Sequence, residues 1–298
     1  MTAPRQIHAG STWMLSRRCS ERRFFLRPSK RSRDVYLYAL AVYAPRYQIQ
    51  LHAFCAMSNH HHLALTDTIG TLPDFARDVH TLIARAMNCS LGRGESFWNG
   101  ESYSGVRLVG KEDVLAKMAY ILANPVEAGL VRRGSDWPGA WSDPRLLGGK
   151  PLKIRRPKGF FDEKGNLPEV VELRLVPPPA FDNHAAFVEL VLQSLAEAEQ
   201  TAIARIEGEG RSFLGLAGVL SQSVDSRPAT SAPMHGLNPR IACRSKWKRI
   251  EVLQRLKEFV RQYKEALADW RRGVRDALFP PGTWHMRVLH GARCADLG

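Results

Sequence analysis

The order of apolar and polar positions in the first half of the chain predicts short strands alternating with helices. Alternating or apolar runs rich in β-forming residues predict strands over residues 11–19, 48–57, 61–67 and 103–109. Apolar residues at steps of three and four predict helices over residues 34–45, 72–91 and 111–123. The last helix is expected to stop or kink at Asn124 and Pro125, because proline lacks a backbone donor.

The order of these elements predicts the fold class. Only the three residues SNH, 58–60, separate the second and third strands, so the two are expected to form a hairpin. The order β-α-β-β-α-β-α predicts an α+β fold with an antiparallel sheet of ferredoxin-like type and helices on one face.

The pattern changes after about residue 146, which divides the chain into three predicted segments. Residues 1–146 carry the regular alternation, and residues 147–183 form a Pro- and Gly-rich linker or wrapping segment with one strand at 170–176. Residues 184–298 are predicted to be mainly helical. They include a helix over 184–206 and a long amphipathic helix over 246–278. The basic face of the long helix fits either a solvated surface or a DNA-contacting one.

The charge balance points to a class of partner. The chain has 298 residues, with 43 Lys and Arg against 29 Asp and Glu, a formal net charge of +14. A polyanion, above all nucleic acid, is the expected partner, and a basic protein without such a partner is the alternative.

Cysteine usage and hydropathy predict the compartment. The five cysteines are odd in number and no two have CxxC spacing, which argues against a disulfide scaffold or a zinc finger. The basic N-terminus lacks the apolar core of a signal peptide, and no stretch approaches the roughly 18 apolar residues of a membrane span. A cytoplasmic protein without membrane association is therefore predicted.

Residues 57–65, MSNHHHLAL, form the first candidate site. Alternate side chains share a face of a strand, so His60 and His62 are expected on one face and His61 on the other. Two imidazoles two residues apart can hold a divalent ion, but hydrogen-bonded or surface histidines have the same spacing. Both interpretations stay open on spacing alone.

The stretch KMAYILANPVEAGLV, residues 117–131, is the second candidate. Tyr120 and Asn124 are four residues apart and project from one side of a helix. A tyrosine hydroxyl is a potential nucleophile and an asparagine amide oxygen a potential metal ligand. Taken alone, a core aromatic for Tyr120 and a helix cap for Asn124 are the better interpretations.

Together, the two stretches resemble a known family. MSNHHH is similar to the HUH signature of single-tyrosine transposases, and YILANPVEAGLV resembles the tyrosine-helix motif of their REP-associated branch. The segments SRRCSERRFF, SFWNGESYSGVRLV and SDWPGAWS follow in the expected order, so the resemblance covers about residues 7–146.

The resemblance implies a single-stranded DNA endonuclease and transposase. Its partner would be single-stranded or hairpin DNA, and its cofactor Mg²⁺ or Mn²⁺ held by His60, His62 and Asn124. Tyr120 would cut the strand and form a 5′-phosphotyrosine that allows rejoining. Phe97 or Trp98 would stack on a base or pack in the core. The expected phosphate contacts are Arg17, Arg18, Arg22 and Arg23.

The chain departs from the family pattern at two positions. His61 stands where a bulky apolar residue is usual, and Glu101 where relatives often have a basic residue. Tyr103 is the runner-up nucleophile. A DNA-binding protein that retains the fold without cutting, and an unrelated metal-dependent hydrolase, are the alternative hypotheses. A monomer and a homodimer are both compatible with the sequence.

Overall fold

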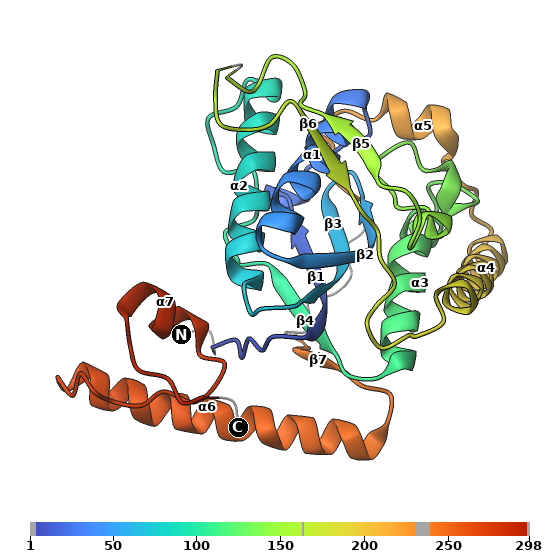
Figure 1. Cartoon of the computed structure of the whole chain (residues 1–298). Helices are drawn as coiled ribbons and strands as arrows, with labels where there is room; N and C mark the ends of the chain where they lie inside the picture. The colour runs from blue at the N-terminus through green and yellow to red at the C-terminus, as the bar shows by residue number, and fades with distance from the viewer. Residues whose placement is uncertain (1–3, 163, 230–238, 297–298) are drawn as a thin grey trace.

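The computed structural model describes residues 4–162, 164–229 and 239–296. Its centre is a five-stranded sheet in the order β2-β3-β1-β4-β7, flanked by helices (Figure 1). The four strands of the first half are β1 (Ser11–Arg18), β2 (Ile49–Ala56), β3 (His60–Asp67) and β4 (Ser104–Leu108).

The strand order confirms the predicted α+β fold. β3 pairs antiparallel with both β2 and β1, and β1 pairs antiparallel with β4. This is the β2-β3-β1-β4 order of a ferredoxin-like β-α-β-β-α-β unit. The hairpin between β2 and β3 turns at Met57–Asn59, where the amide of Met57 donates to the carbonyl of His60 at 2.8 Å.

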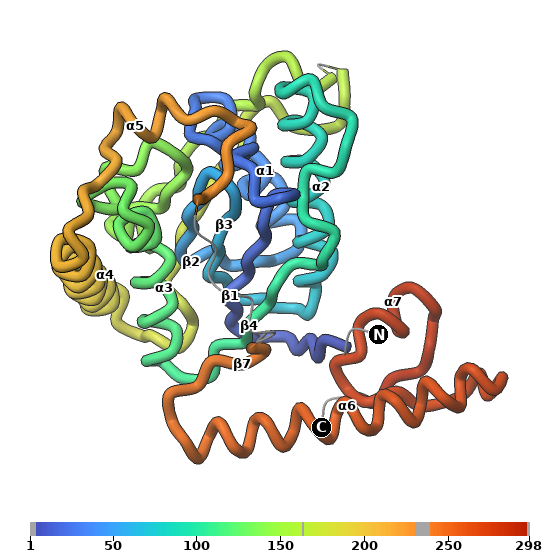
Figure 2. The backbone as a smooth tube through the Cα atoms, turned by 180° about the vertical axis from the view of Figure 1, so that it is seen from behind, coloured from blue at the N-terminus to red at the C-terminus, as the bar shows by residue number. Residues whose placement is uncertain are grey.

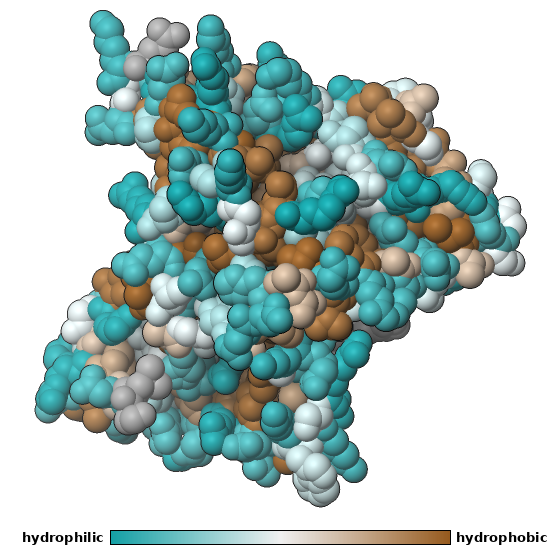
Figure 3. All heavy atoms as spheres, turned by 45° about the vertical axis from the view of Figure 1, so that its right-hand side comes forward, coloured by the Kyte–Doolittle hydropathy of each residue, from teal (hydrophilic) through white to brown (hydrophobic). Residues whose placement is uncertain are grey.

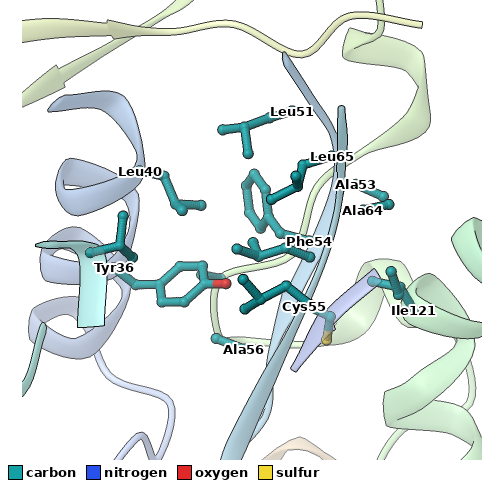
Figure 4. Close-up of a cluster of buried hydrophobic side chains, with 14 of the residues drawn as sticks. Tyr36, Leu40, Leu51, Ala53, Phe54, Cys55, Ala56, Ala64, Leu65 and Ile121 are labelled. Carbon is teal, nitrogen blue, oxygen red and sulfur yellow. The ribbon is translucent and has the colours of Figure 1, made fainter. Parts of the chain in front are cut away.

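Helices cover both faces of the sheet, so the prediction of helices on one face is wrong. α1 (Lys30–Arg46) and α2 (Leu72–Leu91) lie on one face, and α3 (Lys111–Glu127) lies on the other. Figure 4 shows Tyr36 and Leu40 on one side of β2 and β3 and Ile121 on the other. The reason is visible in β2 and β3, which are buried almost throughout instead of at alternate positions.

α3 continues past Pro125 and ends at Glu127, beyond the predicted stop. The Trp141 indole donates to the carbonyl of Leu122 at 2.9 Å, beside the carbonyl that proline leaves without an amide donor. Packing of the buried residues on either side of Pro125 therefore keeps the helix regular through Asn124.

Residues 147–183 run along the first half of the chain. They form the antiparallel pair β5 (Leu152–Arg155) and β6 (Val170–Leu173), which packs near α1. Beyond β6, the amide of Val176 donates to the carbonyl of Leu51 at 2.9 Å. The segment is thereby held against the edge strand β2.

The C-terminal part is mainly helical, as predicted, and adds one strand to the sheet. α4 (His184–Gly208) packs against α3, and β7 (Ile241–Ala242) pairs parallel with β4. The remaining elements are α5 (Gly215–Ser221), α6 (Lys246–Arg271), α7 (Trp284–His290) and the short 3-10 helices η1 (Ser20–Arg22), η2 (Gly134–Asp136) and η3 (Pro144–Leu146).

α6 extends below the sheet with α7 folded back over it (Figures 1 and 2). It ends at Arg271, earlier than the predicted end at 278, because Gly273 adopts the left-handed conformation at φ 98°. Phe279 packs instead into a small second core with Ala266 and Met286.

The face that carries α4 and α5 is mainly hydrophilic, with apolar patches between the polar side chains (Figure 3). Among the described residues, no helix is both long and apolar enough to cross a lipid bilayer.

Candidate active site

His60 and His62 lie on the face of β3 that α3 covers. Their ring centroids are 4.8 Å apart in an edge-on arrangement. The register between β1 and β3 places Ser16 opposite His62 and Arg18 opposite His60. Directly opposed residues share a face of an antiparallel sheet, so these four side chains form one patch.

Each histidine of this pair is oriented through its Nδ1 atom. Nδ1 of His60 donates to Oδ1 of Asn59 at 2.6 Å, since a carboxamide oxygen only accepts. Nδ1 of His62 is hydrogen-bonded to Oγ of Ser16 at 2.6 Å. With Nδ1 engaged in both rings, Nε2 is the atom left to bind a metal ion, as is usual where a second residue fixes a ligating histidine.

α3 brings Tyr120 and Asn124 over the histidine pair. The ring centroids of His62 and Tyr120 are 5.5 Å apart. The Asn124 side chain is buried and hydrogen-bonds to both His60 and Tyr120. Tyr120 is 41% exposed, so its ring reaches the cluster and remains accessible from solvent.

Burial keeps both histidines neutral. It lowers the pKa of His60 to about 4, with a smaller contribution from the Arg18 charge and an opposing one from the Asn124 hydrogen bond. Burial also holds the pKa of His62 well below its usual value, helped by His60, His61, Arg18 and Lys117. Neutral imidazoles at physiological pH have the lone pairs that metal binding needs.

Tyr120 is protonated in the absence of a further cation. Burial raises the pKa of its phenol, and the Asn124 hydrogen bond and the Arg18 charge only partly oppose this. The Lys117 ammonium lies 5.3 Å from the centre of the Tyr120 ring. A cation placed at the histidine pair would oppose the effect of burial and lower the pKa of the phenol.

The donor set fits a divalent ion. No group of three or more His, Cys, Asp or Glu side chains suited to a metal occurs in the part of the chain that the structure describes. Asn124, which is hydrogen-bonded to His60, offers an amide oxygen as a third protein ligand. Two imidazole nitrogens and one amide oxygen can hold a divalent ion whose coordination is completed by water and phosphate oxygens.

Two solved transposases are similar to this chain. One is a REP-associated tyrosine transposase bound to a REP hairpin, 18% identical, with a TM-score of 0.42 over 59% of this chain and 99% of that one. The other is a candidate transposase from Deinococcus radiodurans R1, 21% identical, with a TM-score of 0.29 over 42% and 97%. No family model matches the chain. No curated protein matches it either. Both TM-scores are below 0.5, so what the site can do is inferred from its own residues.

His61 faces the other side of the sheet and is completely buried. Its Nδ1 is 3.1 Å from the Tyr36 hydroxyl and its Nε2 is 3.0 Å from Nε2 of His80. Burial lowers the pKa of His61 to about 3. The unusual residue at this position is therefore a neutral, hydrogen-bonded imidazole in the core between α1 and α2, as expected for a residue that faces the core.

The two neighbouring arginines of β1 point to opposite faces. Arg18 is exposed beside His60, whereas Arg17 pairs with His61 and lies 5.5 Å over the Trp98 ring. Arg17 is therefore separated by the sheet from the histidine pair and Tyr120. Of the two, the structure brings only Arg18 to the candidate site.

The other two predicted phosphate contacts lie in the turn after β1. Arg22 is half-buried in a left-handed conformation with φ 58°. Arg23 pairs with Glu21 at 3.2 Å and donates to the carbonyl of Asp225 at 3.0 Å. Arg23 is thus partly neutralised within the protein, and neither residue contacts the histidine pair.

The remaining aromatic candidates are buried away from the histidine pair. Tyr103 is 7% exposed and packs beneath Arg5 and beside His80. Trp98 packs on His61 and His80, and Phe97 packs on Phe25, so core packing accounts for both. Glu101 is exposed just before β4.

Three residues of the site were not predicted from the sequence. Lys117 precedes Tyr120 by three residues, and helical spacing was a usable signal for it. Asn59 directly precedes His60, within the quoted motif. Ser16 had no such signal, because its position opposite His62 depends on the register between two strands far apart in the sequence.

Proposed function

We propose that this protein is a metal-dependent tyrosine transposase of the HUH type. It cleaves and rejoins single-stranded DNA at hairpin-forming repeats. The observation that carries the proposal is the cluster of His60, His62, Tyr120 and Asn124. Two neutral imidazoles, an amide and a solvent-accessible phenol meet between β3 and α3.

His60, His62 and Asn124 are the residues that would hold Mg²⁺ or Mn²⁺. A bound divalent ion supplies Lewis-acid polarisation of the scissile phosphate and offsets negative charge in the transition state. Ser16 and Asn59 fix the imidazole rings, so that the ligand atoms are in place before DNA arrives.

Tyr120 acts as the nucleophile. Its Oη attacks the phosphorus, the P–O3′ bond breaks, and the 3′ oxygen leaves with a proton while the phenolic proton is lost to solvent. The products are a 5′-phosphotyrosine and a free 3′-OH. Attack of a 3′-OH on the phosphotyrosine reverses the step and joins strands, because the phosphodiester energy is retained in the intermediate.

Arg18 and Lys117 surround this centre with positive charge. Arg18 lies opposite His60 and is exposed, and Lys117 lies beside Tyr120. Both are placed to attract the DNA backbone, in agreement with the net charge of +14.

The covalent intermediate gives a direct test. The protein is incubated with a hairpin-bearing single strand and Mn²⁺, and an adduct that resists SDS is sought by electrophoresis. Tyr120→Phe is expected to abolish the adduct and leave DNA binding intact. Tyr103→Phe is the matched control. Tyr103 is buried beneath Arg5 and beside His80, so the change leaves the histidine pair and Tyr120 untouched.

Each contrary outcome has a clear meaning. Loss of the adduct in Tyr103→Phe but not in Tyr120→Phe would show that the nucleophile is misassigned. Binding of the DNA without adduct or nicking would identify a non-cleaving DNA-binding protein. Metal-dependent cleavage that survives both changes would identify a hydrolase that does not use tyrosine.

A further inference from the structure

A cavity of about 410 Å³ lies on the opposite face of the sheet from the histidine pair. The N-terminal segment, β1, β4, β7 and α6 all contribute to its lining. Trp13 of β1 and Arg107 of β4 are directly opposed in the sheet, so both face the cavity side. Strand alternation from Trp13 to Arg17 places this face with His61, away from Arg18 and His62.

The cavity is strongly cationic. Its lining includes Arg5, Arg107, Arg240 and Arg255, and no carboxylate is present among the described residues that line it. Burial, and then the nearby Arg255 charge, lower the pKa of Arg107. Burial, and then the Arg5 charge, lower that of Arg240. Arg255 also pairs with the exposed Glu251 carboxylate on the same helix at 2.6 Å. The gathering of four guanidinium groups in one lining nevertheless favours an anionic ligand.

Two donors or acceptors in the lining have no partner. The Nε1 atom of Trp13 and the Nδ1 atom of His8 are buried and without a hydrogen-bond partner in the part of the chain that the structure describes. Trp13 is only 4% exposed, so solvent does not satisfy its indole N–H. Buried polar atoms are nearly always paired, and an unpaired N–H facing an arginine-lined cavity points to an acceptor on a ligand.

Part of the cavity lining is apolar. Its aliphatic side chains include Ile241 of β7 and Val252 and Leu256 of α6. A volume of about 410 Å³ lies in the range of small-ligand sites, in which an apolar surface is combined with a few polar groups. This combination fits a flat heterocycle against the aliphatic side chains and a charged group on the arginines.

We propose that this cavity binds one nucleotide unit, with its phosphate on Arg107 and Arg255 and its base against Val252 and Leu256. Guanidinium groups bind phosphate oxygens through paired hydrogen bonds, which ammonium groups do not form. The N–H of Trp13 then donates to the ligand. The nucleotide comes from a nucleic-acid strand or from a free nucleotide, and only the former source rests on the proposed function.

The cavity also assigns a role to the C-terminal part. Arg255, Val252 and Leu256 all belong to α6, which follows β7 in the chain. β7 pairs with β4 through Arg107 and Leu108, so the sheet positions α6 over the cavity. α6 thereby completes a binding site whose other half belongs to the first 110 residues, including Trp13 and Arg107.

Binding measurements on two arginine variants test the proposal. Arg255→Gln and Arg107→Gln each remove one charge from the cavity, and Arg249→Gln is the control. Arg249 is exposed on the same helix and does not line the cavity. The probes are a fluorescein-labelled oligothymidylate of about 15 nucleotides, followed by anisotropy, and deoxyadenosine monophosphate, followed by calorimetry. EDTA is present throughout.

Each cavity variant is expected to weaken oligonucleotide binding about tenfold, because a charged hydrogen bond is lost, and the control is expected to change it far less. Loss of deoxyadenosine monophosphate binding alone, with the oligonucleotide affinity unchanged, would identify a free nucleotide as the ligand. Equal affinities of all three variants for both probes would overturn the proposal. Because Arg255 is exposed, a loss in Arg255→Gln does not reflect misfolding.

The two proposals fail separately. The EDTA measurements do not depend on a metal ion or on Tyr120, and the adduct assay does not depend on Arg255. Unchanged binding in the cavity variants, together with a wild-type adduct, would remove only the nucleotide site. Weakened binding in the variants, without any adduct, would remove only the transposase function.

Discussion

The imidazole of His62 and the phenol of Tyr120 meet edge to face, with their ring centroids 5.5 Å apart. They come from β3 and α3, which pack against each other from opposite sides of the candidate site. Because α3 continues to Glu127, Asn124 is helical and lies one turn after Tyr120 on the same side of the helix.

Ser16→Ala is expected to weaken Mn²⁺ binding by about 10- to 100-fold. The serine hydroxyl orients His62 at 2.6 Å, and its loss frees the ring to rotate. Calorimetric titration with Mn²⁺ measures the effect. Thr12→Val is the control, because Thr12 lies on the same face of β1 and its hydroxyl bonds to Thr66 at 2.8 Å, away from the histidine pair. An equal loss in both variants would contradict the positioning role of Ser16.

Asn124→Ala is expected to slow adduct formation and to shift its rise to higher pH. The Asn124 hydrogen bond opposes the effect of burial on the phenol, so its removal raises the pKa of Tyr120 further. A phenol must ionise to attack, so the rate of adduct formation is expected to rise at higher pH than in the wild type. Single-turnover rates across a pH series give the profile. An unshifted profile with a lower plateau would assign Asn124 to metal binding alone.

Arg18→Gln is expected to weaken DNA binding and to reduce the slope of log K against log salt concentration by about 1, as for the loss of one phosphate contact. Arg17→Gln is expected to leave that slope unchanged, because Arg17 lies on the far face over Trp98. Anisotropy titrations at several salt concentrations compare the two. A larger loss of slope in Arg17→Gln would place the DNA on the other face of the sheet.

His61→Leu is expected to change how stability depends on pH. An unfolded histidine takes up a proton below pH ~6.5, whereas His61 stays neutral in the folded state down to its pKa of about 3. The unfolded state therefore binds more protons between these values, and the free energy of unfolding falls as the pH falls. Leucine does not titrate, so in the variant the free energy of unfolding is expected to fall less steeply as the pH falls, by up to ~1.4 kcal/mol per pH unit.

The same change is expected to destabilise the protein at pH 7 by ~1–3 kcal/mol, because Tyr36 and His80 lose their hydrogen-bond partner. Urea denaturation between pH 4 and 7 measures both effects. His184→Gln, an exposed change on α4, serves as the control and is expected to leave the curve unaltered. A His61→Leu curve parallel to that of the wild type would show that His61 is not the buried neutral group described.

Local patterns were sufficient to predict most of the elements of the first half. The predicted helix over 72–91 coincides with α2, and the strands around SNH coincide with β2 and β3 within about one residue. Apolar periodicity is a property of neighbouring residues, and it is retained when the chain folds. The helix stop predicted at Asn124 and Pro125 is wrong, because a local rule against proline omits the packing that keeps α3 intact.

The sequence by itself determined that His60 and His62 share a face of a strand, and that Tyr120 and Asn124 share a side of a helix, since both follow from backbone geometry. Only the tertiary structure decided which residues complete the site. Ser16 and Arg18 join it through strand register, while Arg17 and Tyr103 lie on the other face. Register and the choice of face depend on contacts between residues far apart in the chain, which no local pattern records.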